Sequence, residues 1–137
     1  MNPAPMPAVT ALYGALMALL LIVLGLRVVA LRRRHRVGIG DGGEGGLARA
    51  IRVHANAVEW GLPVLLLLLV AELNRASPLL LHVAGIALIL GRLMHAVGLT
   101  FRTGLSFGRS GGMALTIAAL VVLAVYDLFA FLRTLAV

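Results

Sequence analysis

The fold is decided by residues 7–26, PAVTALYGALMALLLIVLGL, which contain no charged residue. A helix of about 20 residues, rising 1.5 Å per residue, crosses the roughly 30 Å of hydrocarbon in a bilayer. No basic residue precedes this run and Arg27 follows it directly, so we expect a retained span rather than a cleaved signal peptide. The stretch predicts a protein that is built in lipid.

Three further apolar runs follow the first, separated by short polar links. Only helices and closed barrels satisfy their backbone hydrogen bonds in lipid, and runs of this length are typical of helices. The sequence therefore predicts an all-α fold, an integral membrane four-helix bundle in up-down-up-down order, with one domain over residues 1–137. The expected spans are at about residues 8–31, 53–73, 79–99 and 113–132, with glycine-rich loops at 37–46 and 100–112.

The composition excludes a soluble domain. Hydrophobic residues make up 61% of the 137 residues and charged residues 12%, and a globule this small has too little interior to bury so much apolar surface. The chain has no cysteine, so any thiol chemistry needs a thiol that arrives with a ligand. No metal site is expected either, because the histidines and carboxylates do not fall at metal-ligand spacing.

The net charge of +7 comes from 12 basic residues, all arginine, against five acids. Nucleic-acid binding would explain such an excess, but in a membrane protein arginine collects in the cytoplasmic loops, so no nucleic-acid partner is expected. Ten arginines flank the first and third links and two lie on the other side of the predicted spans. This asymmetry predicts both longer loops in the cytoplasm and both termini on the non-cytoplasmic side. The ten are Arg27, Arg32, Arg33, Arg34, Arg36, Arg49, Arg52, Arg92, Arg102 and Arg109.

Three of the predicted spans contain an ionisable residue: Glu59 in the second, Arg92 in the third and Asp127 in the fourth. A charge near the bilayer centre costs about 2.5–3.5 kcal/mol, so such groups usually face a partner or a cavity. Arg52, Asn56 and Glu59 are spaced i, i+4, i+7 and share one helix face, whereas His54 falls on the opposite face. This face offers a guanidinium, an amide and a carboxylate near the cytoplasmic end.

The third span repeats the pattern, because Arg92, His95 and Arg102 share one face. Two interpretations remain open. Glu59 and Arg92 form an ion pair that only holds two helices together, or the surplus arginines bind an anionic ligand. Arginine matches carboxylates through paired hydrogen bonds, and a buried carboxylate beside an amide suits an ammonium group. The complementary ligand is small, with at least two carboxylates and an amine.

These residues also carry a family resemblance. Residues 52–59, RVHANAVE, with Pro63, resemble the second-helix motif R-x-H/Q-x-N-x-x-E…P of the MAPEG family, the membrane-associated proteins in eicosanoid and glutathione metabolism. Residues 33–37, RRHRV, are similar to the basic stretch that ends the family's first helix. Residues 91–97, GRLMHAV, are similar to its third-helix stretch, and Arg109 and Ser110 to its entry into the fourth helix.

The resemblance implies a bacterial-type member in the inner (plasma) membrane. Such a protein would be a homotrimer that binds glutathione as co-substrate between subunits and conjugates it to a lipophilic electrophile, as a glutathione transferase or peroxidase. Carried over by position, Arg109 would stabilise the thiolate and Ser110 would activate the thiol. The positions that resemble glutathione contacts are Arg33 (or its neighbour Arg32), Arg52, Asn56, Glu59 and Arg92, with His95 beside Arg92.

The chain also departs from the family pattern. Leu99 and Met113 stand where many members have tyrosines, and Trp60 stands where some have another. The missing phenols leave a second interpretation open, in which a non-catalytic trimer binds or presents a lipid or small anionic ligand. A proton-linked transporter built on Glu59 and Arg92 is a third and weaker interpretation.

Overall fold

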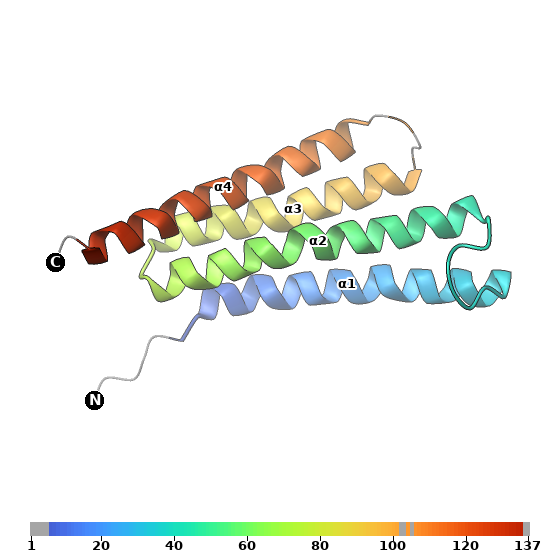
Figure 1. The fold of residues 1–137 in the computed structure, drawn as a ribbon, viewed down its shortest axis with the longest axis horizontal. Coiled ribbons are helices and arrows are strands. Elements are labelled where there is room, and N and C mark those ends of the chain that lie inside the picture. The colour runs from blue at the N-terminus through green and yellow to red at the C-terminus, as the bar shows by residue number, and fades with distance from the viewer. Residues whose placement is uncertain (1–5, 102–103, 105, 136–137) are drawn as a thin grey trace.

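The computed structural model describes residues 6–101, 104 and 106–135. These residues form four helices and no strand (Figure 1), namely α1 (Ala8–His35), α2 (Gly45–Leu73), α3 (Pro78–Phe101) and α4 (Phe107–Leu135). Each helix is long and apolar enough to cross a membrane. The prediction of an all-helical protein with four membrane-length helices is confirmed for this part of the chain.

The helices lie side by side in sequence order (Figure 1). The central pair, α2 and α3, contact each other and both outer helices, whereas no contact joins α1 to α4 within the described residues. The outer helices therefore leave most of their apolar side chains uncovered, as Leu19 and Val23 in α1 and Leu128 and Phe129 in α4 illustrate. Lipid or further copies of the chain must cover this surface, because a large apolar patch is unfavourable in contact with water.

Two helices end on an arginine in the left-handed conformation. The φ angle is 57° at Arg36, just after α1, and 60° at Arg75, just after α2. At the end of α1, the N–H of Val37 donates to the carbonyl of Arg32 at 3.0 Å, and the matching bonds close α2. This is the Schellman arrangement, which usually has glycine at the left-handed position.

Two helices begin earlier than the predicted spans. α2 starts at Gly45 rather than near 53, so the first glycine-rich loop is shorter than the expected 37–46. α4 starts at Phe107 rather than near 113, because the Ser106 hydroxyl accepts the Arg109 N–H at 3.3 Å as an N-cap. The expectation that Arg109 and Ser110 lie in a loop is therefore wrong, and both belong to the first turn of α4.

The start of α1 is capped by α2. Pro7 precedes the helix and supplies no side-chain hydrogen bond. Instead, the Glu72 carboxylate accepts the N–H of Val9 at 2.9 Å and that of Thr10 at 2.7 Å. A carboxylate at a helix N-terminus satisfies orphan donors and opposes the positive end of the helix dipole. Glu72 thus connects the end of α2 to the start of α1. The hydrophobic core of the bundle includes Val64, Leu68, Leu88 and Leu123, all fully buried.

Candidate ligand-binding site

A polar stripe follows the outer face of α2. Arg52 and Glu59 have side chains that are 61% and 52% exposed, and Arg52 Nη1 lies 3.6 Å from Glu59 Oε1. Asn56, midway between them in the sequence, is buried. The ion pair of Glu59 is with Arg52, not with Arg92, which contradicts the first of the two interpretations given above.

Arg92 lies behind this stripe, in the centre of the bundle. It is 1% exposed, and the acceptors it reaches among the described residues are all neutral. Its Nη1 donates to Asn56 Oδ1 at 2.8 Å, its Nε to Thr116 Oγ1 at 3.0 Å, and its Nη2 to the carbonyl oxygen of Gly112 at 3.3 Å. Buried cations usually have an acid beside them, but neither ion pair between described residues involves Arg92.

Arg92 therefore acts on the stripe through Asn56. Because the Asn56 oxygen accepts from the guanidinium, its amide NH₂ group is the part left to donate to another partner. The guanidinium itself is enclosed by α2, α3 and α4 in the single chain. Arg92 is placed to orient Asn56, and its predicted direct contact with a ligand stays a prediction.

The contact between α3 and α4 is what brings Thr116 to Arg92. A Cβ added at Gly112 would overlap the carbonyl oxygen of Gly91 and lie 2.7 Å from the His95 amide, and one added at Gly98 would lie 2.7 Å from the Arg109 amide. The glycines let the two backbones approach as closely as in other membrane helix pairs. Sequence reasoning missed Thr116, although small residues on two neighbouring helices signal such a contact.

Arg109 and Ser110 lie on the first turn of α4. Arg109 is half-buried, and its Nη1 donates to the carbonyl oxygen of Gly104 at 2.8 Å. Ser110 is exposed, and its hydroxyl donates to the carbonyl oxygen of Ser106 at 3.2 Å. The Ser110 oxygen can still accept a hydrogen bond from outside the chain.

His95 lies on α3, one turn after Arg92, on the side that faces α4. It is buried, and it packs against Gly112 of α4, where an added Cβ would lie 2.7 Å from the His95 amide. The structure thus places Arg92 and His95 on the side of α3 that packs against the first turns of α4, which carry Arg109. Arg102, expected on the same face, lies outside the described residues.

Arg33 and His54 lie apart from these residues. Arg33 is exposed at the end of α1 and lines a cavity there with two other arginines. His54 packs against α1, because a Cβ added at Gly25 would lie 3.5 Å from its Nε2. The structure shows no contact between Arg33 and the α2 stripe, so its predicted ligand contact stays a prediction.

The opposite end of the bundle has its own polar contacts. Tyr126 donates to the carbonyl oxygen of Asn74 at 3.2 Å, and Tyr13 lies 3.0 Å from His82 Nδ1. Asp127 lies near this end and outside the candidate site. Within residues 6–101, 104 and 106–135, no three histidine or acidic side chains gather as metal ligands.

Comparison with known proteins assigns this arrangement to a family. The MAPEG family model matches residues 10–129, which reach from α1 into α4. The chain belongs to the MAPEG family. It is 43% identical over 121 residues to the inner membrane protein YecN of Escherichia coli K12, covering 88% of this chain and 91% of that protein. YecN of Escherichia coli O6:H1 shows the same identity and coverage.

This membership confirms the resemblance seen in the sequence motifs. The four apolar helices and the inner-membrane relatives support a multi-pass protein of the bacterial inner membrane.

Proposed function

We propose that this MAPEG protein binds glutathione at the α2 stripe and conjugates it to a lipophilic electrophile. The observation that carries the proposal is the exposed pair of Arg52 and Glu59, which lies on a membrane-length helix beside an asparagine whose oxygen is already bound. A polar stripe of this kind needs a polar partner. The two charges lie 3.6 Å from each other, yet more than half of each side chain stays exposed.

The depth of Glu59 in the membrane gives the size of the cost that a polar partner would remove. Glu59 lies six residues beyond Val53, the expected start of the span, which is about 9 Å along the helix. A charge that faces lipid costs on the order of 2.5–3.5 kcal/mol at the bilayer centre, so this value is the upper limit for Glu59. A second copy of the chain with a polar ligand in the cleft removes this cost, which supports the homotrimer with sites between subunits.

The stripe matches the chemistry of the tripeptide. Glutathione carries two carboxylates, an amine and a thiol. Arg52 can bind a carboxylate through paired hydrogen bonds, Glu59 can accept the ammonium group, and the Asn56 NH₂ can donate to a carboxylate or peptide oxygen. Arg92 supports the site by fixing Asn56.

Arg109 and Ser110 are the proposed catalytic pair. A free thiol has a pKa of about 8.5, so only a few per cent is thiolate at neutral pH, and a nearby guanidinium raises that fraction. In the proposed step the thiol proton leaves to solvent, with the Ser110 hydroxyl as hydrogen-bond partner. The sulfur lone pair then forms a bond to an electrophilic carbon as the leaving group departs with the bonding pair. Arg109 holds the negative charge until that attack.

Binding is tested first, with protein purified in mild detergent and titrated with glutathione by calorimetry. Arg52→Ala and Glu59→Ala each remove one charge-assisted hydrogen-bond partner, worth about 1.5–3 kcal/mol, so we expect the affinity to fall roughly 10- to 150-fold. Leu66→Ala is the matched control, because Leu66 is exposed seven residues further along the same face. If the wild type shows no saturable binding at millimolar glutathione, the proposal fails.

Turnover then separates an enzyme from the alternative, a protein that binds or presents a ligand without chemistry. Met113 favours the alternative, since a thioether stands where a family phenol would donate, with its Sδ 3.8 Å from Arg92 Nη2. We expect wild-type protein to conjugate glutathione to a chromogenic aryl halide. We also expect Arg109→Ala to reduce kcat at least tenfold while binding changes less. Binding with no turnover at any pH would support the presenting role instead.

The proposed site opens to the cytoplasm, with the up-down-up-down order placing both termini outside. The start of α1 and the end of α4 lie at one end of the bundle, opposite the link between α1 and α2 (Figure 1). A phosphatase fused after residue 137 should therefore be active in the periplasm. A fluorescent protein that matures only in the cytoplasm should stay dark there, and the reverse pattern would overturn the orientation.

A further inference from the structure

A second cationic site lies at the end of α1, apart from the α2 stripe. It is an open cavity of about 410 Å³, lined by three arginines, two valines and a glycine. We call it the α1 cavity. Its lining residues are Val29, Arg32, Arg33, Arg36, Val37 and Gly38.

The helix ending builds this cavity. Because Arg36 takes the left-handed conformation, the chain turns back on the last turn of α1, and Val37 N–H bonds to the Arg32 carbonyl. Arg32 Nη1 then donates to the carbonyl oxygen of Gly38 at 3.2 Å, which ties the far wall to the helix. Val37 is braced by the loop, because a Cβ added at Gly42 would lie 2.6 Å from its Cγ2.

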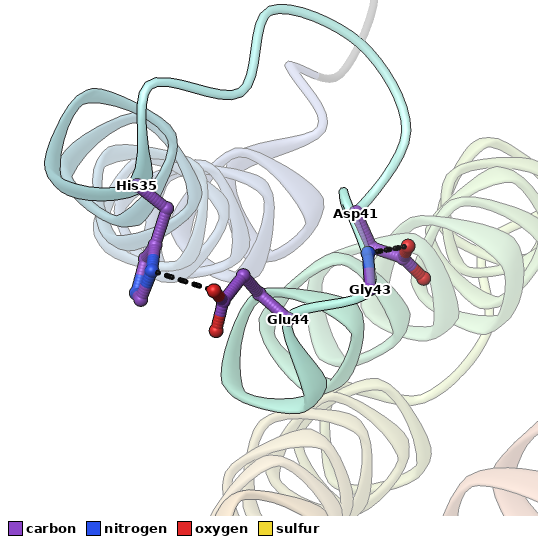
Figure 2. A network of polar contacts seen from close by, with 4 residues as sticks. All are labelled: His35, Asp41, Gly43 and Glu44. Atoms are coloured by element: carbon purple, nitrogen blue, oxygen red, sulfur yellow. Dashed lines mark hydrogen bonds and ion pairs between the residues drawn. The ribbon is translucent and has the colours of Figure 1, made fainter.

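The acids nearest in sequence do not neutralise these arginines. Figure 2 shows that Glu44 turns to His35, with 3.3 Å between Oε1 and Nδ1, and that Asp41 turns to the Gly43 N–H at 3.0 Å. Within the described residues, no carboxylate lies within 4 Å of the three cavity arginines. The negative end of the helix dipole offsets only part of their charge, equivalent to about half an elementary charge.

The cavity also has an apolar side that a free anion would not need. Val29 belongs to the apolar part of α1, and Val37, just after the helix, lines the same cavity. The three cavity arginines follow residues 28–31, VVAL, which are the last apolar residues of α1. This places them at the depth expected for lipid headgroups. Guanidinium groups match phosphate oxygens through paired hydrogen bonds.

We propose that the α1 cavity binds the phosphate of an anionic phospholipid, with the start of an acyl chain against Val29 and Val37. Among the described residues, the cavity makes no contact with the α2 stripe, and this proposal does not depend on glutathione binding. Lipid phosphate would supply the counter-charge that the chain does not provide, and would hold the loop end of α1 at the membrane surface.

The test uses the full-length protein in zwitterionic detergent, with lipid retention measured by native mass spectrometry. Mixed micelles contain either phosphatidylglycerol or phosphatidylcholine, and a third series contains inorganic phosphate without lipid. We expect the wild type to retain about one phosphatidylglycerol per chain, with at least tenfold preference over phosphatidylcholine and no retained inorganic phosphate. Equal retention of both lipids overturns the proposal, and retention of inorganic phosphate alone would identify a free-anion site instead.

A pair of charge-matched variants separates the cavity from net charge. Arg32→Gln with Arg36→Gln removes two cavity arginines, and Arg34→Gln with Arg49→Gln removes two that do not line it. We expect the first double variant to weaken phosphatidylglycerol retention at least tenfold and the second to change it less than twofold. Equal losses in both would show that only overall charge matters.

One single variant covers the case in which the first double variant does not fold. Arg36 is exposed and lies just beyond the helix, so Arg36→Gln leaves the hydrogen bonds within α1 in place. It should weaken retention at least threefold, with circular dichroism unchanged. Wild-type retention by a folded Arg36→Gln protein overturns the proposal.

Discussion

The buried contact between Arg92 and Thr116 makes a quantitative prediction. Thr116 is fully buried, and its Oγ1 accepts from Arg92 Nε at 3.0 Å while donating to the carbonyl oxygen of Gly112 at 3.0 Å. Valine has nearly the same shape as threonine and no hydroxyl. Thr116→Val therefore keeps the packing and removes one acceptor from a buried guanidinium.

The expected cost follows from the charge. A hydrogen bond to a charged group contributes about 1.5–3 kcal/mol, and a buried donor that loses its partner costs its full desolvation. We expect Thr116→Val to lower the free energy of unfolding by about 2 kcal/mol. Thr116→Ser keeps the hydroxyl and loses one methyl group, so it should cost only about 1 kcal/mol.

Unfolding can be followed in mixed micelles with increasing dodecyl sulfate. Circular dichroism reports helix loss, and Trp60, the single tryptophan, reports the environment of α2. A double-mutant cycle with Arg92→Met isolates the contact, because Thr116→Val should cost less than about 0.5 kcal/mol once the guanidinium is gone. The reasoning is refuted if the valine and serine variants are equally stable, or if the valine cost is the same with and without Arg92.

Three further changes test the helix ends and the α3–α4 contact. Glu72→Gln should cost about 1 kcal/mol, because it removes the charge at the start of α1, and hydrogen exchange at the Val9 amide should speed up; unchanged protection would contradict the cap. Gly112→Ala should cost about 1–3 kcal/mol by forcing α3 from α4, whereas Gly46→Ala, which has open space around it, should not destabilise α2. Arg75→Gly should raise the free energy of unfolding by up to about 1 kcal/mol by relieving the left-handed strain, and a fall would contradict that account.

The helices could be predicted because each apolar run is long enough to decide its own structure in lipid. Their starts could not, since hydropathy detects only the part of a helix that lies in hydrocarbon. α2 extends outward to Gly45 and α4 to Phe107, where the residues are polar or small. Glycines at 108, 111 and 112 suggested a loop in the sequence, yet they are helical, and Gly108 and Gly112 lie against the backbone of α3.

The candidate site was predictable only as far as one helix determines it. Spacing alone places Arg52 and Glu59 on one face, and they lie 3.6 Å apart. Spacing cannot show that Arg92 bonds to Asn56 instead of Glu59, because that depends on how closely three helices pack. Thr116 escaped notice for the same reason, since a threonine in an apolar run has no signature until its neighbour across the contact is known.

The cap on α1 has a consequence for how the chain is made. Val9 and Glu72 are 63 residues apart in the sequence, so α1 is synthesised before the carboxylate that accepts from its first amides. These amides acquire this partner only when α2 is in place and its last turn reaches the same end of the bundle. The first helical hairpin is then complete as a unit, while α3 and α4 still have to be inserted before Arg92 finds its acceptors. The contact at the start of α1 therefore needs two helices, whereas the contacts of Arg92 need α2, α3 and α4 together.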